Sequence, residues 1–157
     1  MELSVQSQGG HSSVPPLETT VGILAKAINN VEVNQLPATI TRVVAEMFDS
    51  IGTEFPFYLR ILIANKWLFE KLIVYVMQSK PATNASLRTT TAPTMLMGGT
   101  KENVLAKKAS AVINFRTMPE DSQEYVISHV KNVINDDRVD VSHRPNGISK
   151  EASPISR

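Results

Sequence analysis

The sequence predicts an α+β domain, a ferredoxin-like split βαβ sandwich in which a four-stranded antiparallel sheet carries two helices on one face. Three observations predict this fold. Strand and helix patterns follow one another in the order βα and then ββαβ, a long helical segment separates the two parts, and each of the first two strand segments ends at a glycine pair. We therefore expect one domain over residues 1–157, with a helical insertion at residues 37–85.

The first strand and the first helix are marked by opposite periodicities. Leu3 and Val5 alternate with polar residues, as in a half-buried strand, and this strand stops at Gly9-Gly10. After a proline pair, apolar residues recur at steps of three and four, and this spacing predicts an amphipathic helix that ends near Asn29-Asn30. The apolar residues of this helix are Val21, Leu24, Ala25, Ile28 and Val31.

The insertion is helical in spacing and very apolar over residues 55–77. Seven of the nine aromatic residues lie between Phe48 and Tyr75, which suggests a subdomain with its own small core. Charged side chains interrupt it, so it lacks the run of ~20 uncharged apolar residues that a membrane-spanning helix needs. We expect buried helices here, while a dimer surface or a roof over a lipophilic substrate stays open.

The second half of the chain returns to strands around one further helix. Strand-like sequence covers residues 87–97, ending at Gly98-Gly99, and residues 109–117, where Asn114 and Arg116 share the face opposite the apolar one.

The last helix and the last strand complete the predicted order. Pro119, and Asp121 with Glu124 three residues later, predict the start of a helix that continues to Ile134. Alternating valines around position 140 predict the final strand.

Composition excludes several classes of function. The formal net charge is +1, from 16 basic and 15 acidic residues, so the chain lacks the basic surface that nucleic-acid binding requires. Cysteine is absent, which excludes disulfides, thiolate metal sites and cysteine nucleophiles. We expect neither a nucleic-acid partner nor a membrane span in this segment.

His11 is the candidate catalytic residue among the three histidines. His129 lies within the last predicted helix and His143 at the end of the final strand, where structural or solvated roles are expected. His11 follows Gly9-Gly10, and glycines at a strand exit let the backbone turn sharply and present an imidazole at the sheet end. Local sequence leaves a catalytic residue and a plain turn histidine equally open.

No metal site is expected within the chain. A zinc hydrolase needs three or more His, Asp or Glu ligands and a carboxylate base. The sequence contains no His-x-Asp, no Glu-Glu and no His-Glu-x-x-His, and Asp136-Asp137 follows a helix where a solvated loop is expected.

Four motifs together resemble the lid or dimerisation domain of zinc peptidase family M20, which contains aminoacylase, carboxypeptidase S and succinyl-diaminopimelate desuccinylase. The motifs are GGHSSVP at 9–15, RTTTAPT at 88–94, GGTKENVL at 98–105 and AVINFR at 111–116. The insertion, with NKWLF at 65–69 and NASL at 84–87, is most similar to the carboxypeptidase S branch. Ala106 stands where relatives commonly have proline, and we expect a looser loop around Asn103.

The resemblance implies a role for each site residue. His11 crosses a dimer interface and polarises the scissile carbonyl in the partner's active site. Asn103 and Arg116 bind the substrate, with Arg116 gripping its carboxylate, and Gly98 and Gly99 allow close approach of the backbone. Two zinc ions are expected in the absent catalytic domain of the same parent chain.

The predicted function is that of a homodimerising, substrate-binding lid excised from a longer metallopeptidase or amidohydrolase. The resemblance implies hydrolysis of an amide next to a free carboxylate, in a small peptide or an N-acyl amino acid. The isolated domain should be inactive because it lacks metal ligands. The alternative is a free-standing ferredoxin-like module for self-association or small-ligand binding, in which His11 is a loop residue.

Overall fold

The computed structural model describes residues 1–144, which form two compact units. The first unit consists of Met1–Leu36 together with the chain from Thr90 onward, and the second is Pro37–Thr89.

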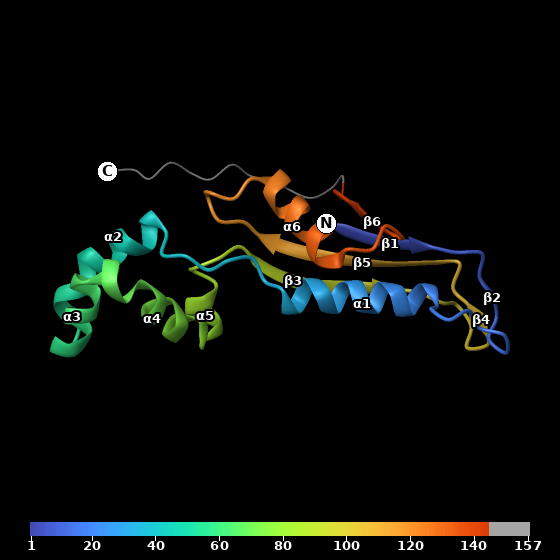
Figure 1. Ribbon diagram of the computed structural model, residues 1–157, viewed down its shortest axis with the longest axis horizontal. Coiled ribbons are helices and arrows are strands. Elements are labelled where there is room, and N and C mark those ends of the chain that lie inside the picture. The colour runs from blue at the N-terminus through green and yellow to red at the C-terminus, as the bar shows by residue number, and fades with distance from the viewer. Residues whose placement is uncertain (145–157) are drawn as a thin grey trace. The chain divides into compact units, whose positions relative to one another are not determined.

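The first unit is built on an antiparallel sheet with the strand order β3-β5-β1-β6 (Figure 1). This finding confirms that the predicted α+β fold mixes helices with a four-stranded antiparallel sheet. Leu3 pairs with Ala111 on one side and Val141 on the other, so apolar side chains share one face across three strands. The strands are β1 (Glu2–Gln6), β3 (Thr90–Met97), β5 (Lys108–Arg116) and β6 (Val139–Ser142).

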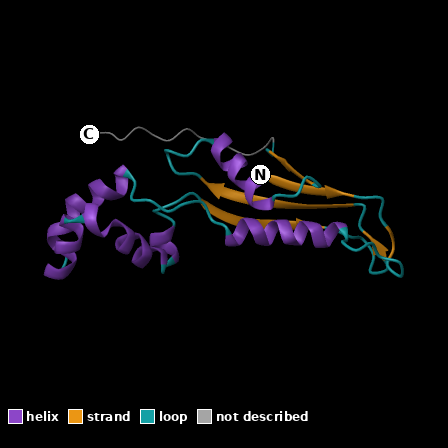
Figure 2. Cartoon of the chain, viewed as in Figure 1, coloured by secondary structure: helices purple, strands orange, loops and turns teal. Residues whose placement is uncertain are grey.

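Two helices pack on this apolar face, α1 (Thr20–Val33) and α6 (Gln123–Ile134) (Figure 2). They contact each other and share one core with the sheet, so both lie on the same side. Fully buried residues of this core come from both the sheet and the helices. Burial of each such aliphatic side chain contributes about 1.5–3 kcal/mol to the free energy of folding. The core residues are Leu3, Val5, Ile23, Leu24, Ala27, Val31, Ala109, Ala111, Ile113, Val130, Ile134 and Val139.

The helix ends differ from the sequence-based expectation. The helix α1 continues past Asn29-Asn30 to Val33, because Val31 is needed in the core at 2% exposure. The N-cap of α6 is Ser122 rather than Asp121, since the Ser122 hydroxyl accepts a hydrogen bond from the backbone N–H of Tyr125. A hydroxyl one residue closer to the helix therefore replaces the predicted carboxylate.

An ion-pair network joins the loop before α1 to the turn between α6 and β6. The Arg138 guanidinium lies 2.7 Å from an oxygen of Asp136 and 2.8 Å from an oxygen of Glu18. The hydrogen bond to Arg138 lowers the pKa of the Asp136 carboxyl from 3.8 to about 2. This pairing links segments that flank the two helices.

The second unit is helical and is closed by a backbone hydrogen bond of 2.9 Å from Thr39 N–H to the Leu87 carbonyl. Its core is small, built on Val44, Phe48, Ile73 and Leu87. No helix within residues 1–144 is long and apolar enough to cross a bilayer. The elements are α2 (Arg42–Ile51), η1 (Gly52–Glu54), α3 (Phe57–Ala64), α4 (Lys66–Gln78) and α5 (Pro81–Asn84).

The expectation that the helices of residues 55–77 are buried is wrong for most of their length. In α3 no residue is buried, and in α4 only Ile73 is. The physical reason is that the core of this unit is too small to cover helices that carry apolar residues on more than one face.

Candidate functional site

His11 lies on a short two-stranded ribbon beside the main sheet. After β1, the chain turns at Gly9 and pairs β2 (Gly10–His11) with β4 (Val104–Leu105), so that His11 is opposite Val104. The ribbon forms the end of this unit beyond β1 and β5 (Figure 1). The predicted presentation of His11 at a sheet end thus has a concrete structural basis.

Gly9 is the residue that permits this turn. Its φ is +70°, in the left-handed region that favours glycine. A Cβ at this position would lie 2.6 Å from Cγ of Lys107 and 3.1 Å from the carbonyl oxygen of Leu105. The backbone of one ribbon strand therefore approaches the other closely only because Gly9 has no side chain.

The His11 ring is exposed and is oriented through its Nδ1 atom. Ser13 contributes both contacts: its backbone N–H donates to Nδ1 at 3.3 Å, and its hydroxyl lies 2.9 Å from the same atom. Because Nδ1 accepts a hydrogen bond from a backbone N–H, the proton of the neutral ring belongs on Nε2. This tautomer leaves Nε2–H as a donor for a group outside the ribbon.

Asn103, Gly98 and Gly99 lie on the loop between β3 and β4 and are close to the histidine ribbon. The Asn103 carbonyl accepts a hydrogen bond of 3.1 Å from the backbone N–H of Ser12. A Cβ on Gly98 would lie 3.4 Å from Val21 at the start of α1, and one on Gly99 would lie 3.7 Å from the Val104 carbonyl. The structure thus brings four of the five predicted site residues to one end of the unit.

Arg116 lies at the other end. It is the last residue of β5 and pairs with Thr90, whereas the ribbon adjoins the first residues of β5, where Lys108 pairs with Gln6. At about 3.4 Å per residue, the length of β5 separates the two ends by roughly 27 Å. Asn114 and Arg116 are exposed on the face opposite the core, while Ile113 is fully buried in it. Within one chain, His11 and Arg116 cannot contact the same small substrate.

Thr20, Ser7 and Lys107, which were not among the predicted site residues, hold the ribbon in place. Thr20, only 4% exposed, donates from its hydroxyl to the Ala106 carbonyl at 2.8 Å and lies 2.6 Å from the Ser7 hydroxyl. The Ser7 backbone N–H donates to the Lys107 carbonyl at 2.8 Å. The Thr19-Thr20 doublet was a usable signal: Thr19 caps α1, which leaves Thr20 free for another partner.

The same contacts bear on the loop that contains Ala106. Its carbonyl accepts hydrogen bonds from Thr20 and, at 3.4 Å, from the Ser7 hydroxyl. A carbonyl is present whether position 106 is alanine or proline, so this anchor does not depend on the proline that the resemblance led us to expect.

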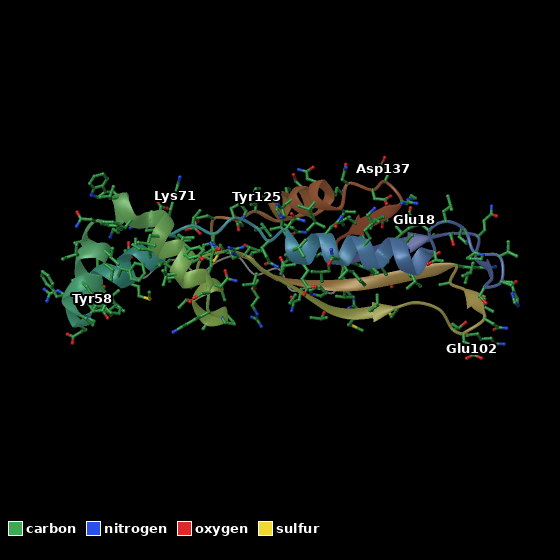
Figure 3. The ribbon with its side chains drawn as sticks, turned by 60° about the horizontal axis from the view of Figure 1, so that its bottom comes forward. Glu18, Tyr58, Lys71, Glu102, Tyr125 and Asp137 are labelled. Carbon is green, nitrogen blue, oxygen red and sulfur yellow. The ribbon has the colours of Figure 1, made fainter. Side chains whose placement is uncertain are left out.

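The remaining candidates lie elsewhere. His129, on α6, places Nε2 at 2.8 Å from the carbonyl of Asn34, the C-cap of α1, which is a structural contact. Among residues 1–144 no group of three or more His, Asp or Glu side chains could hold a metal ion. Near the ribbon, Glu102 projects outward from the loop that precedes β4 (Figure 3).

Comparisons with known proteins bear on the whole chain. The family model described as the peptidase dimerisation domain matches residues 1–141. The chain is 44% identical over 156 residues to probable carboxypeptidase S-like 2 of Dictyostelium discoideum, covering 99% of this chain and 30% of that protein. It is 41% identical over 138 residues to N-fatty-acyl-amino acid synthase/hydrolase PM20D1 of Homo sapiens, covering 87% of this chain and 28% of that protein.

Among solved structures, the chain is similar to an M20 family metallo-carboxypeptidase from Sulfolobus solfataricus. The TM-score is 0.46 at 20% identity, over 85% of this chain and 38% of that chain. The chain spans less than a third of the length of the two curated relatives.

Proposed function

Because this chain belongs to the peptidase dimerisation domain family of the M20 metallopeptidases, we propose that it is the lid and dimerisation domain of a longer zinc-dependent exopeptidase or amidohydrolase. The domain would cover residues 1–157, and the compact unit Pro37–Thr89 supports treating the predicted segment 37–85 as a helical insertion within it. The strand order β3-β5-β1-β6 supports the ferredoxin-like assignment.

The proposed reaction of the parent enzyme is hydrolysis of an amide next to a free carboxylate. The names of the relatives, a carboxypeptidase and an N-fatty-acyl-amino acid hydrolase, support a peptide C-terminus or an N-acyl amino acid as substrate. The described residues do not fit a zinc site, so the two zinc ions would be held by the catalytic domain of the parent chain.

His11 would act as a hydrogen-bond donor to the carbonyl oxygen of the scissile amide. Its support is the engaged Nδ1, which places the proton on the exposed Nε2. A donor aimed at a developing oxyanion contributes about 100–1,000-fold in rate. Asn103 on the adjoining loop would bind the same substrate, and Gly98 and Gly99 would let the backbone come close to it.

The dimer interface is proposed at the free edge of β3. This strand lies at the edge of the sheet and has no charged residue, and Met95, Leu96 and Met97 are exposed. An uncharged apolar edge offers unpaired backbone groups to a second strand. The pairing of β3 with β5 shifts in register between Pro93 and Met95 and continues regularly on both sides of the shift.

The separation of His11 from Arg116 is the observation that carries the proposal. The two residues lie at opposite ends of β5, yet each suits one part of the same substrate: a donor for the amide carbonyl and a guanidinium for the carboxylate. A symmetric dimer resolves this, because each active site takes Arg116 from its own chain and His11 from its partner.

Mixed dimers of the parent enzyme test this arrangement. His11→Ala and Arg116→Ala should each lower turnover strongly without changing zinc content. When the two inactive variants are mixed and allowed to exchange subunits, half of the dimers are mixed and one site in each has both residues, so about a quarter of wild-type activity should return. Failure of the mixture to recover activity, with subunit exchange verified, would contradict the division of the site between chains.

A further inference from the structure

The helix α4 is apolar on two adjacent faces, and only one of them is covered. Phe69, Ile73 and Met77, spaced by four residues, belong to the core of the helical unit. The neighbouring face carries Leu68, Leu72, Tyr75 and Val76, at steps of four, three and one, and all four are exposed. A helix with an apolar stripe this long is expected to have a partner for it.

Helix α3 continues the pattern. Phe57 and Ile61 share one face of a helix that has no buried residue, and both are exposed. Three aromatic residues of the two helices are highly exposed: Phe57 is 75% exposed, Trp67 78% and Tyr75 76%. We name the exposed apolar residues of these two helices the aromatic face, defined as Phe57, Ile61, Trp67, Leu68, Leu72, Tyr75 and Val76.

Basic side chains flank the aromatic face, whereas the acidic side chain of Glu70 lies away from it. At 100° per residue, Arg60 and Lys71 flank the apolar stripes of α3 and α4, whereas Glu70 points to the opposite side of α4. Lys66, further round α4, is already paired with Asp49 at 2.6 Å. Tyr58 and Lys71 project away from their helices (Figure 3). The aromatic face is therefore bordered by cations and amphipathic aromatic rings.

We propose that the aromatic face docks on the surface of an anionic phospholipid bilayer. Helices that lie in a membrane interface have this composition, with Trp, Phe and Leu entering the headgroup boundary and Lys or Arg contacting anionic headgroups. Tyrosine and tryptophan are enriched at the same depth. This surface belongs to α3 and α4 alone, so docking through it does not depend on the enzyme assignment.

The charges also argue against a second copy of the same face as the occupant. In a two-fold interface each patch meets its own copy, so Arg60 and Lys71 would approach further cations around a small apolar contact. An anionic lipid surface neutralises the same side chains. The bilayer is therefore the occupant to which the charge pattern is complementary.

Trp67 makes the proposal directly measurable, because it is the chain's single tryptophan and belongs to the aromatic face. The 157-residue chain is titrated with phosphatidylcholine vesicles, with and without phosphatidylserine, while Trp67 emission and co-sedimentation are recorded. We expect a blue shift and sedimentation with phosphatidylserine, and a marked weakening at high salt.

Two independent variants keep the reporter and remove the proposed contacts. Phe57→Ser/Tyr75→Ser removes two highly exposed rings, so folding should be unaffected, and Arg60→Glu/Lys71→Glu reverses the flanking charge. At about 1 kcal/mol, or fivefold, per cation, loss of two cations should weaken binding at least tenfold. Leu17→Ser, at an exposed leucine outside the helical unit, is the matched control and should bind as the wild type does.

Each other outcome overturns the proposal. Absence of a blue shift with anionic vesicles would do so, as would binding by both variants that is as tight as wild-type binding. A light-scattering mass that falls from dimer to monomer in Phe57→Ser/Tyr75→Ser would identify the face as an interface between copies. Binding by the 157-residue chain but not by a longer parent protein would show that the rest of the parent covers it.

Discussion

The backbone N–H of Ser12 donates a hydrogen bond of 3.1 Å to the carbonyl oxygen of Asn103. These residues are far apart in sequence, and the bond ties the ribbon strand that carries His11 to the loop that carries Asn103. The two proposed substrate contacts are therefore positioned by one another, and a change that displaces either backbone should displace both.

Replacing Gly9 with alanine tests how the ribbon is held. Its φ of +70° strains any residue that carries a Cβ, and that Cβ would lie only 3.1 Å from the Leu105 carbonyl oxygen. We expect the free energy of unfolding, measured by urea denaturation, to fall by about 1–2 kcal/mol. Gly99→Ala is the control, since its nearest heavy atom lies at an ordinary 3.7 Å. Equal stability of the two variants would contradict the strained turn.

The buried hydroxyl of Thr20 is expected to stabilise the base of the ribbon. Thr20→Val keeps the shape but leaves the Ala106 carbonyl and the Ser7 hydroxyl without this partner, at a cost of about 1–3 kcal/mol in unfolding free energy. Thr20→Ser, which keeps the hydroxyl, should lose less. If valine and serine prove equally stable in thermal denaturation, the hydrogen bonds contribute nothing.

Acid should weaken the fold through Asp136. Its pKa in the folded protein, lowered to about 2 by Arg138, lies below the ordinary 3.8, so the pairing stabilises the protein above pH 4. This contribution is lost as the pH falls from about 4 towards 2, when the carboxyl becomes protonated in the native state. In Asp136→Asn the unfolding free energy should decline less steeply over this range. A wild-type slope in Asp136→Asn would refute the assignment.

A single charge on β3 should weaken dimerisation through the proposed edge. Leu96 is 63% exposed on β3, so Leu96→Lys should leave the monomer folded while placing a cation on the strand edge. We expect the dimer dissociation constant, measured by light scattering across a dilution series, to rise at least tenfold if the edge is the interface. Val33→Lys, at an exposed apolar residue of α1, serves as the comparison. Unchanged dissociation of the Leu96 variant would place the interface elsewhere.

Strong periodicity explains what could be predicted of the fold. The alternation around Leu3 and Val5, and the helical spacing that contains Val31, correspond to residues that the core buries completely or nearly so. The ribbon could not be predicted, because two-residue strands have no period, and the pairing of Gly10 with Leu105 joins distant parts of the chain. The exposure of α3 and α4 was missed because an apolar pattern does not say whether a partner is present.

The candidate site also has features that the sequence predicts and features that it does not. His11 stood out because its glycines have a local conformational meaning, and Gly9 does adopt a positive φ. Asn103 lies near His11 and Arg116 lies far from it because of how the strands are connected. Local sequence patterns do not reveal this connectivity. Thr20 was overlooked because a threonine at a helix start is ordinarily taken for a cap, and here Thr19 has that role.

The hydrogen bond between the Thr39 N–H and the Leu87 carbonyl brings the two ends of the helical unit together, so that the unit is an insertion with adjacent ends. A segment that leaves and re-enters its host through neighbouring points adds little loop-closure entropy, which grows only slowly with length. Evolution, or a protein engineer, can thus lengthen, shorten or exchange residues 37–89 without altering the register of the sheet.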